Sequence, residues 1–167
     1  MEWTVPESAR KRIVGFAAYC GYQLLSCSQE GVLACINVQP HHLNYYGKVH
    51  GGLIGTIMDA TAGLTASFAG PEQRPAVTRS ADIHYFLPVS GSVIKASGHV
   101  IRAGKTMCLV YVDVLDENDT ICATGAFEYF YVDNKYKDFF EKKRKRGLQI
   151  CPDCAIIHKL SMKDMRD

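Results

Sequence analysis

The sequence predicts an α+β domain in which an antiparallel β-sheet wraps around one long central helix. Residues 51–69 form an apolar stretch that carries a single charge. A helix that is apolar on nearly every face must be covered by other structure. Residues 76–132 contain four strand-like segments joined by short, turn-forming connectors. Connectors this short favour antiparallel neighbours, because a parallel crossover needs about a dozen residues or more.

The elements are expected in the order helix, two strands, long helix, four strands. An N-terminal helix is predicted from Pro6 to Tyr19, with an apolar stripe at Ile13, Val14, Phe16 and Ala17. Gly70-Pro71 ends the long helix. The strands are predicted at 23–27, 32–38, 76–87, 92–102, 106–115 and 120–132. The connectors at 88–91, 103–105 and 116–119 predict that the last four strands pair consecutively as hairpins.

Composition indicates one folded domain with appended ends. The chain is 47% hydrophobic and 22% charged, which is ordinary for a globular protein. We divide it into an N-terminal helix at 1–19, a main domain at 20–133 and a basic extension at 134–167. The extension holds ten Lys and Arg against five Asp and Glu. Its block Lys142 to Arg146 is typical of a solvated charge run, with nuclear import or binding to an anionic surface as the alternative.

Seven cysteines, an odd number, favour free thiols in a reducing compartment. Cys151, Cys154 and His158 supply at most three ligands where structural zinc needs four, so no metal is expected unless another chain contributes a ligand. A redox pair at Cys151 and Cys154 is the alternative, although no thioredoxin-like βαβ pattern surrounds it. No signal peptide and no apolar run of about 18 residues is visible. A cytoplasmic location is expected, with a mitochondrial one open and nuclear entry through the basic extension as a third option.

The predicted long helix has an unusual content. Asp59 lies among apolar residues, and a buried, unpaired carboxylate is costly enough to be a candidate site residue. The alternative interpretation is that Asp59 has only a structural role and hydrogen-bonds to Thr56 or Thr61. Glycine costs a helix about 1 kcal/mol relative to alanine, so something is expected to approach the helix backbone closely at Gly51, Gly52, Gly55 and Gly63.

His50 precedes this helix by one residue, and Asp59 follows His50 by nine. Nine residues are about two and a half turns, so the two side chains are expected on opposite sides of the helix and about 13 Å apart. They then cannot act on one substrate within one chain. If both act, the site must combine two subunits.

The residues Asn44, His50-Gly51-Gly52, Asp59, Phe86-Leu87-Pro88 and Gly104-Lys105, in this order, resemble the hotdog-fold thioesterases of the PaaI type. The resemblance covers about residues 20–132. It implies the hotdog fold, hydrolysis of acyl-CoA or related thioesters, and dimers or dimers of dimers with sites at subunit interfaces. No cofactor is implied beyond coenzyme A as part of the substrate, and neither a membrane span nor a nucleic-acid partner is expected.

The resemblance also implies roles for five residues. Asp59 would act as general base or nucleophile. The Gly51 N–H, at the positive end of the helix dipole, would bond the thioester carbonyl and the oxyanion formed from it. Asn44 and His50 would position the thioester or its leaving group and hold the loop. Thr78 would help to orient the attacking water beside the carboxylate.

Other assignments concern the two ends of the substrate. For the nucleotide end of CoA the candidates are His84, Arg102, Gly104, Lys105 and Thr106. Aromatic residues permit an aryl or a fatty acyl group, namely Tyr45, Tyr46, Tyr85 and Phe86. His41-His42 are interpreted as an exposed loop pair. Two rival functions stay open: a hotdog enoyl-CoA hydratase or dehydratase, and a non-catalytic acyl-CoA-binding protein whose basic extension binds a partner.

Overall fold

The computed structural model describes residues 5–70 and 72–132, and the statements below concern these residues. They belong to the first of two compact units, residues 1–132. The predicted basic extension, with Lys142 to Arg146, Cys151 and Cys154, lies outside the described residues.

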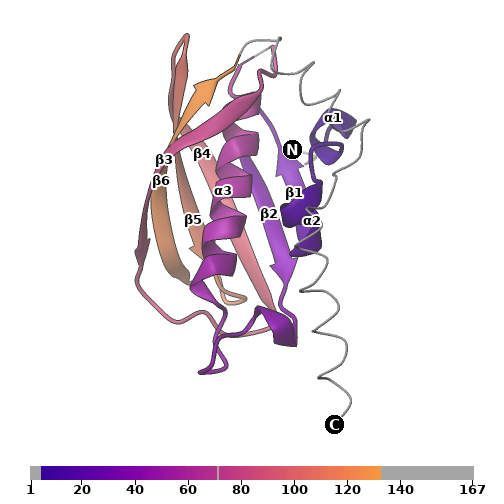
Figure 1. Cartoon of the computed structure of the whole chain (residues 1–167), viewed down its shortest axis with the longest axis vertical. Coiled ribbons are helices and arrows are strands. Elements are labelled where there is room, and N and C mark those ends of the chain that lie inside the picture. Colours follow the sequence, from indigo (N-terminus) through magenta and orange to yellow (C-terminus); the bar gives the residue numbers. More distant parts are fainter. Residues whose placement is uncertain (1–4, 71, 133–167) are drawn as a thin grey trace, which may run out of the picture. The chain divides into compact units, whose positions relative to one another are not determined.

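Six antiparallel strands form one sheet in the order β1-β2-β4-β5-β6-β3. Helix α3 (Gly51–Phe68) runs along one face of the sheet and contacts all six strands (Figure 1). The predicted α+β architecture, a sheet around a central helix, is therefore confirmed. The strands are β1 (Tyr22–Cys27), β2 (Gly31–Asn37), β3 (Ala76–Tyr85), β4 (Val93–Ala103), β5 (Met107–Leu115) and β6 (Ile121–Tyr131).

The core lies between α3 and the sheet. Strands β4 and β5 alternate over much of their length between fully buried and partly exposed residues, because one face of the sheet meets the helix. The largest fully buried side chains include Phe127, Ile36, Ile57, Met58 and Ile94. This packing fixes α3 against the sheet along its length.

Helix α3 packs closely against β4 at Gly98. A Cβ atom at this position would lie 2.6 Å from Oγ1 of Thr65 and 3.0 Å from Cγ2 of Thr61. We expect Gly98→Val to lower the free energy of unfolding by about 3 kcal/mol, because overpacking would push the helix off the sheet. Urea denaturation measures this change. Gly70→Ala is the matched control, since no atom lies within 4 Å of that position, and equal stability of the two variants would contradict the prediction.

The predicted helix from Pro6 to Tyr19 is wrong. Two short helices occur instead, α1 (Glu7–Arg10) and α2 (Gly15–Tyr19). Between them Val14 is extended, with φ −141° and ψ 169°, and Gly15 has φ +62°, so the helical path is interrupted. Consequently the expected apolar stripe is divided: Ile13 and Ala17 pack partly buried against the core, whereas Val14 and Phe16 are exposed.

The expected hairpin between the third and fourth strands is also wrong. β3 pairs with β6 at the edge of the sheet, and residues 86–92 cross the end of the sheet to reach β4. Hydrogen bonds fix this crossing: Phe86 and Leu87 donate to the Cys122 carbonyl, and Val49 donates to the Val89 carbonyl at 3.1 Å. Seven extended residues span about 23 Å, whereas three strand spacings need about 14 Å.

The described cysteines are free thiols, and all five are buried: Cys20, Cys27, Cys35, Cys108 and Cys122. In the described part of the chain, no helix has the length and apolar character that a membrane crossing requires.

Candidate active site

His50 caps α3 and leaves one backbone donor open. Its Nδ1 accepts a hydrogen bond from the Gly52 N–H at 2.9 Å, and its carbonyl accepts from the N–H groups of Leu53 and Ile54. Among the described residues, the Gly51 N–H has no protein acceptor. A free donor therefore stands at the positive end of the α3 dipole.

The His50 ring offers a second donor. Because Nδ1 accepts from Gly52, the neutral imidazole carries its proton on Nε2. The ring lies against Gly52, where a Cβ atom would come within 3.0 Å of Nδ1, and it is exposed. Among the described residues, the Nε2–H has no acceptor and is available to a ligand.

The expectation that His50 and Asp59 lie on opposite sides of the helix is wrong. His50 precedes the helix and folds back onto Gly52, and Gly52 and Asp59 are seven residues apart, which is about two full turns. The separation along the axis remains. Gly51 and Asp59 are eight residues apart, or about 12 Å along α3.

Asn44 organises the loop before α3. Its Oδ1 accepts from the N–H groups of Tyr46 at 2.9 Å and Lys48 at 3.1 Å, and its own N–H donates to the Lys48 carbonyl. Gly47 has φ +70°, which lets the chain reverse within this loop. The turn positions Val49 and His50 at the start of helix α3.

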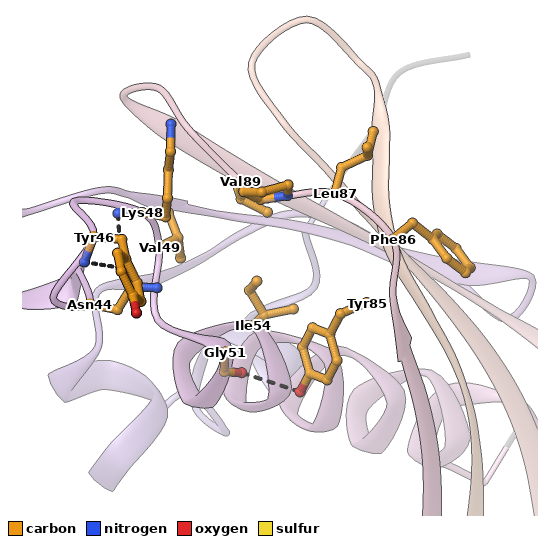
Figure 2. Close-up of a pocket in the computed structure, with 11 residues that line it drawn as sticks. Asn44, Tyr46, Lys48, Val49, Gly51, Ile54, Tyr85, Phe86, Leu87 and Val89 are labelled. Carbon is orange, nitrogen blue, oxygen red and sulfur yellow. Dashed lines mark hydrogen bonds between the residues drawn. The ribbon is translucent and has the colours of Figure 1, made fainter.

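A pocket of about 550 Å³ opens beside Gly51 (Figure 2). Its walls come from this loop, from the first turn of α3 and from the segment after β3. The Tyr85 hydroxyl donates to the Gly51 carbonyl at 3.3 Å, so its ring closes one side. The volume suits a small-molecule ligand. The lining is mostly apolar and aromatic: Asn44, Tyr46, Lys48, Val49, Gly51, Ile54, Tyr85, Phe86, Leu87, Pro88 and Val89.

The Asp59 carboxylate is held by two hydroxyl groups. Its Oδ1 accepts from Thr78 at 2.7 Å and from Tyr129 at 2.8 Å. The expectation of a buried, unpaired acid is wrong, because Asp59 is exposed in this chain and accepts these bonds. The suggested partners bond elsewhere: Thr56 donates to the Gly52 carbonyl, and the Thr61 hydroxyl pairs with Tyr22.

A β-bulge places Thr78 on the helix side of the sheet. Side chains alternate between faces along a strand, and Ile83 and Tyr85 of β3 both approach Gly55 of α3. Regular alternation would turn Thr78 to the opposite face. The register shifts between Thr78 and Ser80, so Thr78 lies directly across from Tyr129 on β6.

The residues suggested for the nucleotide end of CoA lie away from this pocket within one chain. The end of β4 carries Arg102, and the turn that follows carries Gly104, Lys105 and Thr106. Both lie near the end of the sheet where Ala76 pairs with Tyr131. Tyr85, which contacts Gly51, lies at the other end of β3. His84 is exposed on β3, with Nε2 3.4 Å from the Asp82 carboxylate.

The expectation that His41 and His42 are both exposed is wrong for His42, which is buried, whereas His41 is exposed. Its Nδ1 accepts from the Gln39 N–H at 3.0 Å, and its carbonyl accepts from the His50 N–H at 2.9 Å. Burial lowers the pKa of His42, and the neighbouring His41 lowers it further. His42 therefore supports the loop as a neutral ring.

The described residues contain no group of three or more metal-ligating side chains.

Sequence reasoning missed Tyr129 and the cation at the pocket, Lys48, whose Nζ donates to Ser90 at 2.8 Å. A signal for Tyr129 was present. Gly63 lies one turn beyond Asp59, and a Cβ atom there would come within 3.3 Å of the Tyr129 ring and hydroxyl. Gly63 stands out in the sequence as a glycine inside a helix, but nothing in the sequence identifies Tyr129 as the residue that packs against it.

The sheet around α3, with an open donor at the start of the helix, defines a hotdog-fold protein. The chain belongs to the thioesterase superfamily, whose family model matches residues 46–123. Acyl-coenzyme A thioesterase 13 of Homo sapiens is 31% identical over 97 residues, covering 56% of this chain and 67% of the human protein. The Mus musculus protein of that name is 28% identical over 95 residues, with the same coverage.

Solved structures share the fold. A hypothetical thioesterase protein from Streptococcus pneumoniae, with coenzyme A, is 26% identical with a TM-score of 0.62, covering 66% of this chain and 85% of that one. The PaaI protein of E. coli is 16% identical with a TM-score of 0.68, covering 75% of this chain and 90% of its own. At that identity PaaI supports the fold alone.

Proposed function

We propose that this protein hydrolyses acyl-CoA thioesters, at sites that combine the Gly51 donor of one subunit with Asp59 of another. Membership of the thioesterase superfamily supports thioester hydrolysis in general. The relatives named acyl-coenzyme A thioesterase and the Streptococcus pneumoniae structure with coenzyme A support the CoA ester. The observation that carries the proposal is the open Gly51 N–H beside an apolar pocket.

The proposed chemistry starts at the carbonyl group. The thioester oxygen accepts from the Gly51 N–H, which is placed to stabilise the negative charge that develops there. His50 donates from Nε2 to the same oxygen or to the departing sulfur. The second oxygen of Asp59, Oδ2, takes a proton from a water whose oxygen bonds to the carbonyl carbon. The carbon–sulfur bond then breaks, and the departing thiolate takes up the proton that Asp59 accepted, directly or through water. The products are the acid and the CoA thiol, and Asp59 is again ionised. Direct attack by Asp59 through a covalent anhydride is the alternative.

Two subunits are needed because of distance. Reacting groups must come within about 3–3.5 Å of each other, whereas Gly51 and Asp59 are about 12 Å apart along one helix. Asp59 is exposed and contacts the edge strand β3, most of whose residues are also exposed. An unpaired strand edge readily joins a second chain. A partner across β3 would bring its own Gly51 to this carboxylate.

The pocket favours an acyl group that is apolar. Its aromatic walls suit an aryl or a fatty chain, and Lys48 supplies a cation at the pocket. We assign the phosphates of CoA to the β4–β5 turn, through Arg102 and Lys105 of the partner subunit, with His84 as a secondary contact. This assignment requires the shared site, since the turn is distant from Gly51 within one chain.

A thiol-release assay over short-chain, long-chain and aryl CoA esters tests the function. The wild type is expected to release CoA from at least one class, and Asp59→Ala is expected to release none above background. Hydration of an enoyl-CoA without thiol release would assign a hydratase instead. Tight binding of CoA esters with no turnover would assign a binding protein.

A further inference from the structure

Two tyrosines of β6 reach across to α3, and they make different contacts. The Tyr129 hydroxyl lies 2.8 Å from Oδ1 of Asp59 and 2.7 Å from the Asp59 carbonyl oxygen. The Tyr131 hydroxyl donates to the Ala66 carbonyl at 3.1 Å. One phenol therefore contacts the proposed base, whereas the other hydrogen-bonds to the helix backbone at Ala66, seven residues further along α3.

The position of Tyr129 is tightly defined. The side chain is 2% exposed, and Gly63 leaves the space that its ring occupies beside the helix. Tyr129 is also the direct cross-strand partner of Thr78, because of the bulge in β3. Both hydroxyl groups thus reach the same carboxylate from adjacent strands.

The two donors act on one oxygen. Oδ1 of Asp59 accepts from Thr78 and from Tyr129, and a carboxylate oxygen has about two lone-pair sites. Among the described residues, Oδ2 has no hydrogen-bond partner. Oδ2 is therefore the oxygen left to take a proton.

The phenol remains a donor throughout the physiological pH range. Burial raises the pKa of Tyr129, and the charge of Asp59 raises it further. A group that keeps its proton can hold a carboxylate in one orientation without competing with it for protons.

We propose that Tyr129 is a positioning residue for the reaction: with Thr78, its hydroxyl fixes Oδ1 of Asp59 and presents Oδ2 to the attacking water. This inference rests on the proposed function. Loss of one donor frees the carboxylate to rotate, so fewer enzyme molecules hold Oδ2 in the reactive orientation. Substrate binding is expected to change little, because the Tyr129 side chain is only 2% exposed and lies behind Asp59, away from the surface that a substrate contacts.

Tyr129→Phe removes the hydroxyl and keeps the ring. We expect kcat to fall by about tenfold to a hundredfold, the range for a hydrogen bond to a charged group, with KM changed by less than about twofold. Tyr131→Phe is the matched control, since it removes a phenol–helix bond from the same strand without touching Asp59. Its kcat is expected to stay within about twofold of the wild type.

The double variant Thr78→Ala with Tyr129→Phe measures whether the two donors act on one group. We expect its kcat to fall well below that of Thr78→Ala and to approach that of Asp59→Asn, because no donor then holds Oδ1.

Three outcomes would overturn the inference. They are an unchanged kcat in Tyr129→Phe, an equal loss in Tyr131→Phe, and a double variant no slower than Thr78→Ala. Activity that is lost in Asp59→Asn but kept in Tyr129→Phe contradicts this inference and leaves the proposed function intact. A wild type that hydrolyses no thioester contradicts the proposed function itself.

Discussion

Asp59→Asn is expected to lower kcat by about 10³-fold, within the range that a positioned general base contributes. The amide oxygen can still accept from Thr78 and Tyr129, so the side chain keeps its place beside β3. The amide nitrogen that replaces Oδ2 cannot accept a proton. Steady-state thiol release on the best substrate of the panel measures the loss, and the melting temperature should match the wild type.

Asp82→Asn is the control for this change. Asp82 is also an exposed aspartate, on β3, and its contact is with His84. Its removal is expected to leave kcat near that of the wild type. Undiminished turnover in Asp59→Asn, or an equal loss in both variants, would show that Asp59 is not the base.

Gly51→Val is expected to lower kcat by about 10²–10³-fold, the loss typical of removing one oxyanion donor. The fold should tolerate the change. The atoms nearest to a Cβ at Gly51 are in the Tyr85 ring, at 3.8 and 4.0 Å, which are ordinary contact distances. The valine methyl groups would occupy the space through which a carbonyl oxygen reaches the N–H.

Gly51→Ala tests the steric cause. Alanine adds a single methyl group, which is smaller than the valine side chain. The kcat of Gly51→Ala is therefore expected to lie between that of the wild type and that of Gly51→Val. Circular dichroism and melting temperature confirm that each variant is folded. A folded Gly51→Val protein with normal kcat would exclude the Gly51 N–H as the oxyanion donor.

Local patterns in the sequence predict most of the fold. The apolar stretch with Gly70 beyond it predicts α3, and alternation with turn residues predicts every strand to within about two residues of its observed bounds. Pairing is different, because it depends on contacts distant in the chain. The place of β3 beside β6 follows from the crossing of residues 86–92, which no local spacing reveals.

The site shows the same division. Asn44, His50, Gly51 and Asp59 stand out in the sequence because glycines and a lone acid are unusual in an apolar helix. Tyr129 reads in the sequence as an ordinary strand tyrosine. Its contact with Asp59 depends on the register of β6 against β3 and on which face of α3 meets the sheet, both of which require the folded structure.

The exposure of Asp59 likewise could not be predicted from the chain alone. An apolar helix is expected to be covered on all sides, yet one sheet covers one side of α3, and the side that carries Gly52 and Asp59 stays open. In the proposed assembly a second subunit covers this side. Exposure in the single chain and participation in a site are then consistent.

Mixing Gly51→Val and Asp59→Asn subunits tests the shared site most directly. The two variants are unfolded together, refolded as a mixture and assayed for thiol release beside each variant treated alone. A shared site predicts recovery to about a quarter of wild-type activity, because random mixing into two-fold dimers makes about half of them mixed, each with one intact site. No recovery in a mixture shown to contain mixed dimers would contradict a site built from two subunits.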